Sequence, residues 1–187
     1  MRHGKPLFIT GNQDKADYLS KMLRVALEHK KLELDELQST SLDTIVTHKV
    51  KQAYQLAGVP VLVEDVALEF HALDGLPGPF IKYFVDSSNG LENLCRMLDG
   101  FEDRGATARC TFGYYDGKNL QLFQGSLDGT IALSPKGSNG FGWDKIFCPE
   151  GYGGLTRAEL GDEDNEKTYT TIKPFAKVRE YLSSKDA

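Results

Sequence analysis

Cysteine is scarce in this sequence, and its spacing excludes two of its common structural uses. The three cysteines among the 187 residues, Cys95, Cys110 and Cys148, are widely spaced and form no CxxC pair. An odd and scattered set indicates neither a disulfide framework nor a zinc knuckle. A reducing compartment is therefore the simpler expectation.

Long apolar runs and a surplus of basic residues are also lacking. No stretch is long enough to span a bilayer, and the N-terminal MRHGKPLFIT lacks the core of a signal peptide. We therefore expect a cytosolic protein without a membrane partner. A formal net charge of −5 argues against a nonspecific binder of nucleic-acid polymers. It leaves small nucleotides as eligible ligands, because a few lysines and a divalent metal neutralise a triphosphate locally.

Internal repeats and linkers rich in proline, glycine or serine are absent as well. At this length we therefore expect one domain over residues 1–187, either compact or with two lobes. The four histidines share no metal-ligand spacing, and we interpret them as surface or strand-packing residues.

Strand and helix patterns alternate along the first third of the chain. Apolar residues at helical spacing predict helices over 14–28 and 42–57, and short apolar or alternating runs predict strands over 6–10, 31–37 and 59–63.

The turn before the first of these helices is a candidate anion site. Asn12 is a candidate N-cap, and Lys15 lies one turn into the helix. Backbone N–H groups that are unpaired at a helix start attract anions. The alternative for Lys15 is an ordinary solvated lysine, because this turn is not a Walker loop.

The rest of the chain contains fewer helix signals. We expect a helix over 90–98, antiparallel strands over 106–115 and 120–131, and a closing helix over 172–182. The acidic run at 162–166 fits a solvated loop or a helix start.

Two adjacent carboxylates, Glu64 and Asp65, follow the apolar run 59–63. We expect this run to be a buried strand, and acids at the end of a buried strand lie at a sheet edge where ligands gather. The pair predicts a metal or acid–base site, or alternatively a solvated acidic turn. The rigid turn at 76–79 that follows is a hinge or part of a cleft floor, and base rates favour trans peptides before its prolines.

The most glycine-rich loop, residues 134–142, leads into Trp143. An aromatic side chain on a glycine-flanked loop, such as Phe141, is a common way to stack a planar base. The alternative is that Phe141 and Trp143 anchor the loop in the core.

Four separated motifs agree in order and approximate spacing with one family. They are TGNQDK at 10–15, VEDVALEFHALDGLPGPFIKYF at 63–84, GFEDRGATARCTF at 100–112 and FGWDKIFCPEGY at 141–152. On these motifs the chain resembles the inosine triphosphate pyrophosphatase family over nearly its whole length, and LPGPF resembles its eukaryotic-type members.

The resemblance implies a fold and an activity. The fold is an elongated α/β structure in which helices flank a long mixed sheet and two lobes enclose the site in a cleft. The activity is hydrolysis of inosine, xanthosine and related deoxynucleoside triphosphates to the monophosphate and pyrophosphate. The resemblance also implies a Mg²⁺ cofactor and a cytosolic homodimer.

The resemblance further assigns residues around the phosphates and the metal. Glu36 and Asp65 match acids expected around Mg²⁺. We expect Asp65 to orient or deprotonate the attacking water, with Glu64 as the nearby alternate. Lysines neutralise the non-bridging oxygens of a triphosphate. The matches to the phosphate-binding positions are Thr10, Asn12, Lys15 and Lys49.

The FGWD motif supplies the expected base site, with Phe141 stacked on the purine and Trp143 and Asp144 beside it. One departure, Val66 in place of a serine or threonine, removes a hydroxyl near the metal or the phosphates. Triphosphate hydrolysis is expected to tolerate this loss.

A second departure affects base selection. The family has a lysine followed by Ser-His-Arg, which reads the 6-oxo group of the base. A gapless alignment places Asn165 at the lysine and 169–171 at Ser-His-Arg. A shift of two residues instead places Lys167, Thr171 and Lys173 at the lysine, serine and arginine, and we prefer it because phosphate neutralisation needs a cation. The histidine is missing in both alignments, so we expect relaxed or redirected base selectivity.

Two other functions stay open. One is a nucleotide-binding protein of the same fold with little catalysis, and the other is a hydrolase for another nucleotide, such as a modified pyrimidine. The acids and lysines of a metal-and-water site argue against a pure binder.

Overall fold

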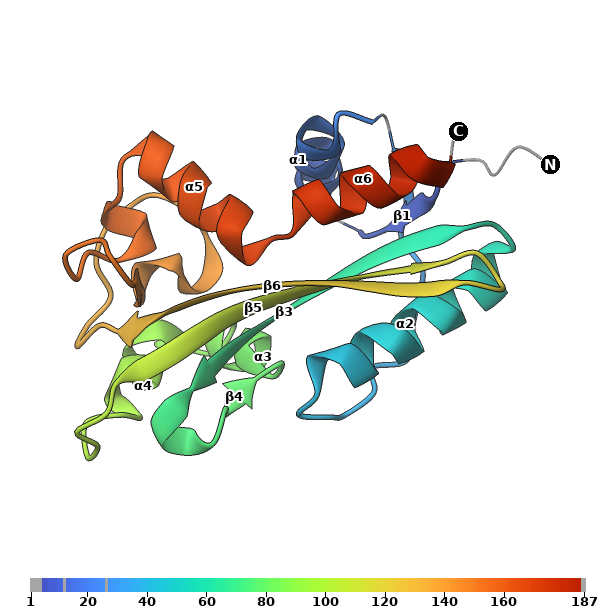
Figure 1. The fold of residues 1–187 in the computed structure, drawn as a ribbon. Coiled ribbons are helices and arrows are strands. Elements are labelled where there is room, and N and C mark those ends of the chain that lie inside the picture. The colour runs from blue at the N-terminus through green and yellow to red at the C-terminus, as the bar shows by residue number, and fades with distance from the viewer. Residues whose placement is uncertain (1–4, 12, 26, 186–187) are drawn as a thin grey trace. The chain divides into compact units, whose positions relative to one another are not determined.

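The computed structural model describes residues 5–11, 13–25 and 27–185, shown as a ribbon in Figure 1. The strands are β1 (Leu7–Ile9), β2 (His29–Lys30), β3 (Val61–Phe70), β4 (Pro77–Gly78), β5 (Gly105–Tyr115), β6 (Leu120–Ile131) and β7 (Phe147–Pro149). The helices are α1 (Gln13–Leu23), α2 (Leu42–Ala57), α3 (Ile81–Val85), α4 (Gly90–Arg96), α5 (Asp162–Ile172) and α6 (Phe175–Lys185), with short 3-10 turns η1 (His71–Leu73), η2 (Gly142–Lys145) and η3 (Arg157–Glu159).

The strands form one mixed sheet in the order β2-β1-β3-β5-β6-β7, with β4 paired to β3. β1 runs parallel to β2 and β3, whereas β4 is antiparallel to β3 and β7 is antiparallel to β6. The expected α/β fold with a mixed sheet and flanking helices is therefore confirmed. The cleft between two lobes stays a prediction.

The chain divides into two compact units, each built from separated segments. The first unit comprises Met1–Asp65, Thr111–Gln124 and Pro174–Ala187, and the second comprises Val66–Cys110 and Gly125–Lys173. β3, β5 and β6 contribute residues to both units. The expectation of a single domain over 1–187 stays a prediction.

In the first unit, helices cover both faces of the sheet. α2 lies on one side, and α1 and α6 lie on the other (Figure 1). The alternation of a strand explains this arrangement: on β5, Tyr115 packs edge-on against Tyr54 of α2, while its neighbour Tyr114 packs against Tyr181 of α6. Both faces of β5 are therefore covered within the unit.

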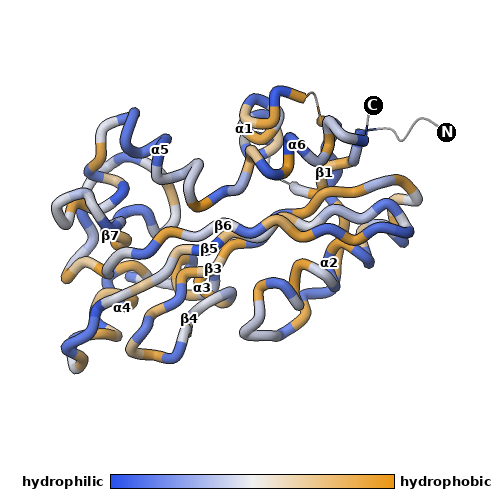
Figure 2. The backbone as a smooth tube through the Cα atoms, viewed as in Figure 1, coloured by the Kyte–Doolittle hydropathy of each residue, from blue (hydrophilic) through white to orange (hydrophobic). Residues whose placement is uncertain are grey.

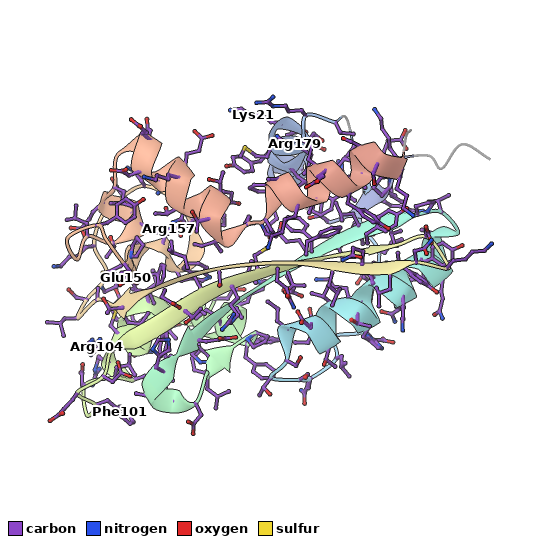
Figure 3. All side chains as sticks on the ribbon, viewed as in Figure 1. Lys21, Phe101, Arg104, Glu150, Arg157 and Arg179 are labelled. Carbon is purple, nitrogen blue, oxygen red and sulfur yellow. The ribbon has the colours of Figure 1, made fainter. Side chains whose placement is uncertain are left out.

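In the second unit, one arginine connects α4 to the end of β6. Arg104, labelled in Figure 3, donates from Nε to the Ile131 carbonyl and from Nη2 to the carbonyls of Cys95 and Ala132, at 2.8–2.9 Å. The acidic run at 162–166 forms the start of α5, and the hydropathy colouring of Figure 2 is hydrophilic there. Acidic side chains in a first turn stabilise a helix through its dipole.

Two predicted elements have the observed bounds, and others differ for identifiable reasons. The helix over 42–57 and the strand over 120–131 are confirmed as α2 and β6. The strand over 31–37 is wrong: β2 pairs only with β1, which ends at Ile9, so the stretch after Lys30 has no partner strand among the described residues. α1 ends at Leu23, short of the predicted 28.

The C-terminal helix and the proline turn also differ from expectation. The predicted closing helix over 172–182 is confirmed as α6 from Phe175 onward, whereas Ile172 belongs to α5, because Pro174 lacks an N–H and separates the two helices. The Leu76–Pro77 peptide is cis rather than trans. Over the described parts of the chain, no helix is long and apolar enough to cross a membrane.

Candidate functional site

The acid pair lies within β3 and not at its end. The run that starts at Val61 continues through Glu64 and Asp65 to Phe70, with Ala67 and Leu68 buried. The expectation of a strand ending at 63 is therefore wrong. β3 continues because it pairs with β5 and β4 and because apolar residues resume beyond the acids.

The end of β1 nevertheless brings a sheet edge to the acid pair. β1 and β3 pair in parallel, Leu7 with Val61 and Phe8 with Leu62. Extending this register places Thr10, directly after β1, level with Glu64. The Thr10 N–H donates to the Lys30 carbonyl at 3.1 Å, which holds the residue after β1 beside β2. Asn12 lies outside the described residues.

On one face of β3, Asp65 contacts a lysine of α2. Lys49 Nζ lies 3.0 Å from Asp65 Oδ2 and 3.5 Å from the Glu64 carbonyl oxygen. Both side chains are about one-third exposed, at 31% and 30%. The structure therefore joins two of the predicted site residues in a solvent-accessible ion pair.

The neighbouring acid projects to the opposite face, because successive strand side chains alternate. Glu64 Oε1 lies 3.9 Å from Lys15 Nζ on α1, and only 6% of the Glu64 side chain is exposed. Lys15 and Lys49 thus reach adjacent positions of one strand from helices on opposite faces.

Glu36 lies outside regular structure. It is exposed in the stretch between β2 and α2. Among the described residues, no three or more His, Cys, Asp or Glu side chains form a group that could hold a metal ion. Glu36 and Asp65 therefore do not belong to a preformed cluster of three such ligands.

In the second unit, the two aromatic residues of the FGWD motif differ in environment. Phe141 is 62% exposed at the start of η2. Trp143 packs edge-on against Phe147, with ring centroids 5.7 Å apart. Each of the two interpretations therefore fits one of these residues. Trp143 anchors the loop, and Phe141 presents its ring to solvent.

Asp144 is buried beneath this loop. Its Oδ2 accepts a hydrogen bond from the Phe141 N–H at 3.1 Å, and its Oδ1 accepts one from Arg157 Nη1 at 2.5 Å. Burial raises the pKa of Asp144, and the charges of Arg157 and Lys173 oppose this rise. Both carboxylate oxygens therefore have partners within the protein.

The three residues predicted from the shifted alignment differ in exposure. Lys167 and Thr171 are exposed on α5, and the Thr171 hydroxyl donates to the Lys167 carbonyl at 2.9 Å. Lys173 is buried, with Nζ 4.8 Å from the centre of the Tyr169 ring. Of the three, Lys173 lies beside the aromatic group around Phe141.

Arg157 was missed from the sequence, and Tyr169 was considered only in the gapless alignment, which was not the preferred one. The centroids of the Tyr169 and Phe141 rings lie 6.4 Å apart, and Arg157 Cζ lies 5.3 Å from the Tyr169 centroid. A helical stripe was the signal that could have found Tyr169. The stripe faces Arg157 and the core of the second unit, and consists of Asn165, Thr168, Tyr169 and Ile172.

Comparisons with known proteins agree with this fold and these motifs. A model of the Ham1 family matches residues 7–181. The chain is 42% identical over 184 residues to the inosine triphosphate pyrophosphatase of Yarrowia lipolytica, covering 96% of each protein. It is 40% identical over 182 residues to that of Schizosaccharomyces pombe, covering 95% of each.

A solved structure also matches. The nucleoside-triphosphatase, a dITP/XTP pyrophosphatase, of Mycobacterium abscessus has a TM-score of 0.79 and 26% identity, over 94% of this chain and 98% of that one. The resemblance based on four motifs is therefore confirmed by matches that span nearly the whole sequence. This chain belongs to the Ham1 family.

Proposed function

We propose that this chain is a nucleoside triphosphate pyrophosphatase, which hydrolyses inosine, deoxyinosine and xanthosine triphosphates to the monophosphate and pyrophosphate. The observation that carries the proposal is the Lys49 and Asp65 pair, 3.0 Å apart at the acid pair of β3, in a chain of the Ham1 family. The fungal relatives are named inosine triphosphate pyrophosphatases, and the mycobacterial protein is named a dITP/XTP pyrophosphatase.

Mg²⁺ is the proposed cofactor, and the donor chemistry of the site fits it. Mg²⁺ prefers oxygen ligands and is often held by one or two carboxylates together with substrate phosphates and water. Asp65 and Glu36 would supply these carboxylates, and such a site needs no closed group of three acids. When bound, the ion would neutralise charge on the phosphate oxygens.

Asp65 has the catalytic role in the proposed reaction. Its carboxylate orients a water molecule and accepts a proton from it as the water oxygen attacks phosphorus. The bond between the attacked phosphorus and the oxygen that bridges the α- and β-phosphates breaks. This oxygen stays with the other phosphate, which leaves as the second product. Water is the only co-reactant, and the products are the monophosphate and pyrophosphate.

Four other residues of the first unit are proposed to bind the phosphates. Lys49 fixes the Asp65 carboxylate, and its flexible stem allows the ammonium to turn toward a phosphate oxygen. Glu64 is the less favoured base, because it projects to the face where Lys15 meets it. The proposed phosphate ligands are Thr10, Asn12, Lys15 and Lys49.

The base is proposed to stack on Phe141, whose ring is largely exposed. Trp143 and Asp144 hold the loop that carries this ring. Lys173 supplies the cation near it, while Lys167 and Thr171 remain proposed contacts from the exposed side of α5. Because the sequence lacks the family's histidine here, base selectivity is proposed to be relaxed or redirected.

The protein is further proposed to act in the cytoplasm as a homodimer. Its three free cysteines are all buried, which suits a reducing compartment. The homodimer rests on the family resemblance.

A substrate panel tests the proposal. The purified protein with Mg²⁺ is offered inosine, xanthosine, adenosine and pyrimidine triphosphates, and pyrophosphate is measured. We expect release from several of them, and loss of release in Asp65→Ala. Binding without release would favour the nucleotide-binding alternative, preference for a pyrimidine would favour the third function, and a strong preference for inosine triphosphate would contradict relaxed selectivity.

A further inference from the structure

Arg157 is the most deeply buried charged side chain of the second unit, and its guanidinium makes several hydrogen bonds. Only 2% of the side chain is exposed. Besides Asp144, it contacts α5: Nε donates to the Thr168 hydroxyl at 3.0 Å, and Nη2 donates to the carbonyl and Oδ1 of Asn165 at 3.3 and 3.1 Å. Figure 3 shows Arg157 beneath α5.

These contacts connect the FGWD loop to α5. Arg157 holds one oxygen of Asp144, and the other oxygen holds the Phe141 N–H. The loop approaches this carboxylate so closely that a Cβ at Gly140 would lie 2.2 Å from Asp144 Oδ2, and Gly140 has a φ of 72°. Glycine is therefore required there, and the position of Phe141 depends on a carboxylate that Arg157 fixes.

Tyr169 lies where the two segments meet. Arg157 Cζ and Lys173 Nζ lie 5.3 and 4.8 Å from the centre of its ring, within the range of cation–π attraction. The Phe141 ring meets it at 73°, with centroids 6.4 Å apart. Two cations and one aromatic ring therefore hold this half-buried tyrosine.

The angle between these rings defines what each could contact on a planar ligand. A base stacked on Phe141 lies parallel to that ring and hence steeply inclined to Tyr169. Tyr169 would therefore meet the edge of the base, where the exocyclic groups that distinguish bases project. An aromatic wall at that edge accepts or rejects such groups by size and shape.

We propose that Tyr169 is a specificity-determining residue that closes the edge of the base site beside Phe141, and that Arg157 is the positioning residue that fixes both. This inference rests on the proposed function, because it takes Phe141 to be the stacking residue. A buried arginine whose donors are satisfied by several partners gives a fixed geometry, which a wall that discriminates between bases requires.

The test separates binding of the base from binding of the phosphates. Isothermal titration calorimetry in EDTA measures Kd for inosine triphosphate and for inorganic tripolyphosphate, which has no base. We expect Tyr169→Ala to weaken nucleotide binding by about tenfold or more and to leave tripolyphosphate binding within twofold. Tyr169→Phe, which keeps the ring, should restore nucleotide binding.

The control is Glu163→Gln on the same helix, where an exposed side chain lies in the first turn of α5. It should change neither Kd. If Tyr169→Ala does not fold, Tyr169→Leu removes the ring while retaining an apolar side chain of similar length. Unchanged nucleotide binding in the folded variant would overturn the role of Tyr169.

Arg157 has its own prediction. Arg157→Lys keeps the charge but cannot serve Asp144, Thr168 and Asn165 at once. We expect a raised Kd for the nucleotide, an unchanged Kd for tripolyphosphate, and in turnover a larger change in KM than in kcat. Equal weakening of both ligands would overturn the positioning role.

Failure of the proposed function would give a different result. If no triphosphate releases pyrophosphate but nucleotide binding still depends on Tyr169, the catalytic proposal fails and this inference holds. If pyrophosphate is released and binding ignores Tyr169, the inference fails and the catalytic proposal holds.

Discussion

Each unit of the molecule contains an ion pair between a basic residue and an aspartate, and the two pairs differ in burial. Lys49 and Asp65 in the first unit are each about one-third exposed, whereas Arg157 and Asp144 in the second are 2% and 5% exposed. The first pair joins a flexible ammonium to one carboxylate oxygen. The second joins a planar guanidinium to several acceptors at once.

This difference separates groups that can act in chemistry from groups that maintain geometry. An exposed pair is worth little to stability and exchanges partners readily. A buried pair is costly to break, because the remaining charge has no water around it. Asp65 is therefore suited to work on a substrate, and Asp144 to hold the loop that carries Phe141.

The largest expected effect is on turnover, through Asp65. Asp65→Asn preserves shape but removes the proton acceptor, so we expect pyrophosphate release to fall by about 10²- to 10⁴-fold with little change in Tm. The matched control is Asp86→Asn, which alters the exposed Lys82 and Asp86 pair of α3. A retained rate in Asp65→Asn, or an equal loss in the control, would argue against a catalytic Asp65.

The next effect is on stability, through Arg157. Arg157→Met leaves Asp144 buried without its partner, so we expect the free energy of unfolding to fall by about 3–5 kcal/mol. Urea denaturation measures this change. Replacing both residues, Arg157→Met with Asp144→Leu, should recover part of the loss, and an additive loss would show that the pair is not coupled.

Asp116 tests whether burial, and not the unit in which an aspartate lies, decides how much that aspartate contributes to stability. It belongs to the first unit, and its side chain is only 2% exposed. Burial alone raises the pKa of Asp116, but hydrogen bonds from Asn119 and Lys118 and the charge of Lys185 together lower it from 3.8 to about 2. The unfolded state therefore binds the proton first as the pH falls.

The stability that Asp116 contributes is accordingly complete above about pH 4 and lost as the pH falls toward 2. We expect about 2 kcal/mol to disappear over this window, and Asp116→Asn to lose that part of the pH dependence. Unfolding free energies measured from pH 5 to pH 2 check it. An identical pH profile in the variant would remove Asp116 from the account.

The smallest effect belongs to Lys49. Lys49→Met removes an exposed partner, so we expect a loss of less than about 1 kcal/mol in unfolding free energy. The same change removes a cation that competes for the Asp65 carboxylate, and Mn²⁺ should bind the nucleotide-free protein up to about fivefold more tightly by electron paramagnetic resonance. A large loss of stability would show that the Lys49 and Asp65 pair contributes as much as the buried Arg157 and Asp144 pair, and would contradict the difference proposed between them.

Local patterns predicted the elements that carry their own signals. α2 has an apolar stripe, Ser41 accepting from the Thr44 N–H at its start, and Gly58 with a φ of 68° at its end, so its bounds followed from the sequence. β3 was underpredicted because its acids resemble a strand end. The lysines that meet them come from α1 and α2, which the local pattern of β3 does not contain.

Site residues could be proposed from the sequence where the residue type alone suggests a role, and not where the role depends on contacts with distant segments. Motifs made Asp65, Lys49 and Phe141 candidates, and their roles stay predictions. Arg157 was not proposed, and Tyr169 was named only in the alignment that was not preferred, because the η3 and α5 segments are dominated by charged and small polar residues whose partners lie in other loops. The inward stripe of α5 is visible in hindsight from its spacing of three and four residues.

Product analysis of inosine triphosphate turnover tests the central claim most directly. The purified protein with Mg²⁺ is given the nucleotide, and ³¹P NMR follows the phosphorus species. The account predicts inosine monophosphate and pyrophosphate in equal amounts from the first turnovers. Inosine diphosphate with inorganic phosphate, or a nucleotide that is bound and not cleaved, would contradict it.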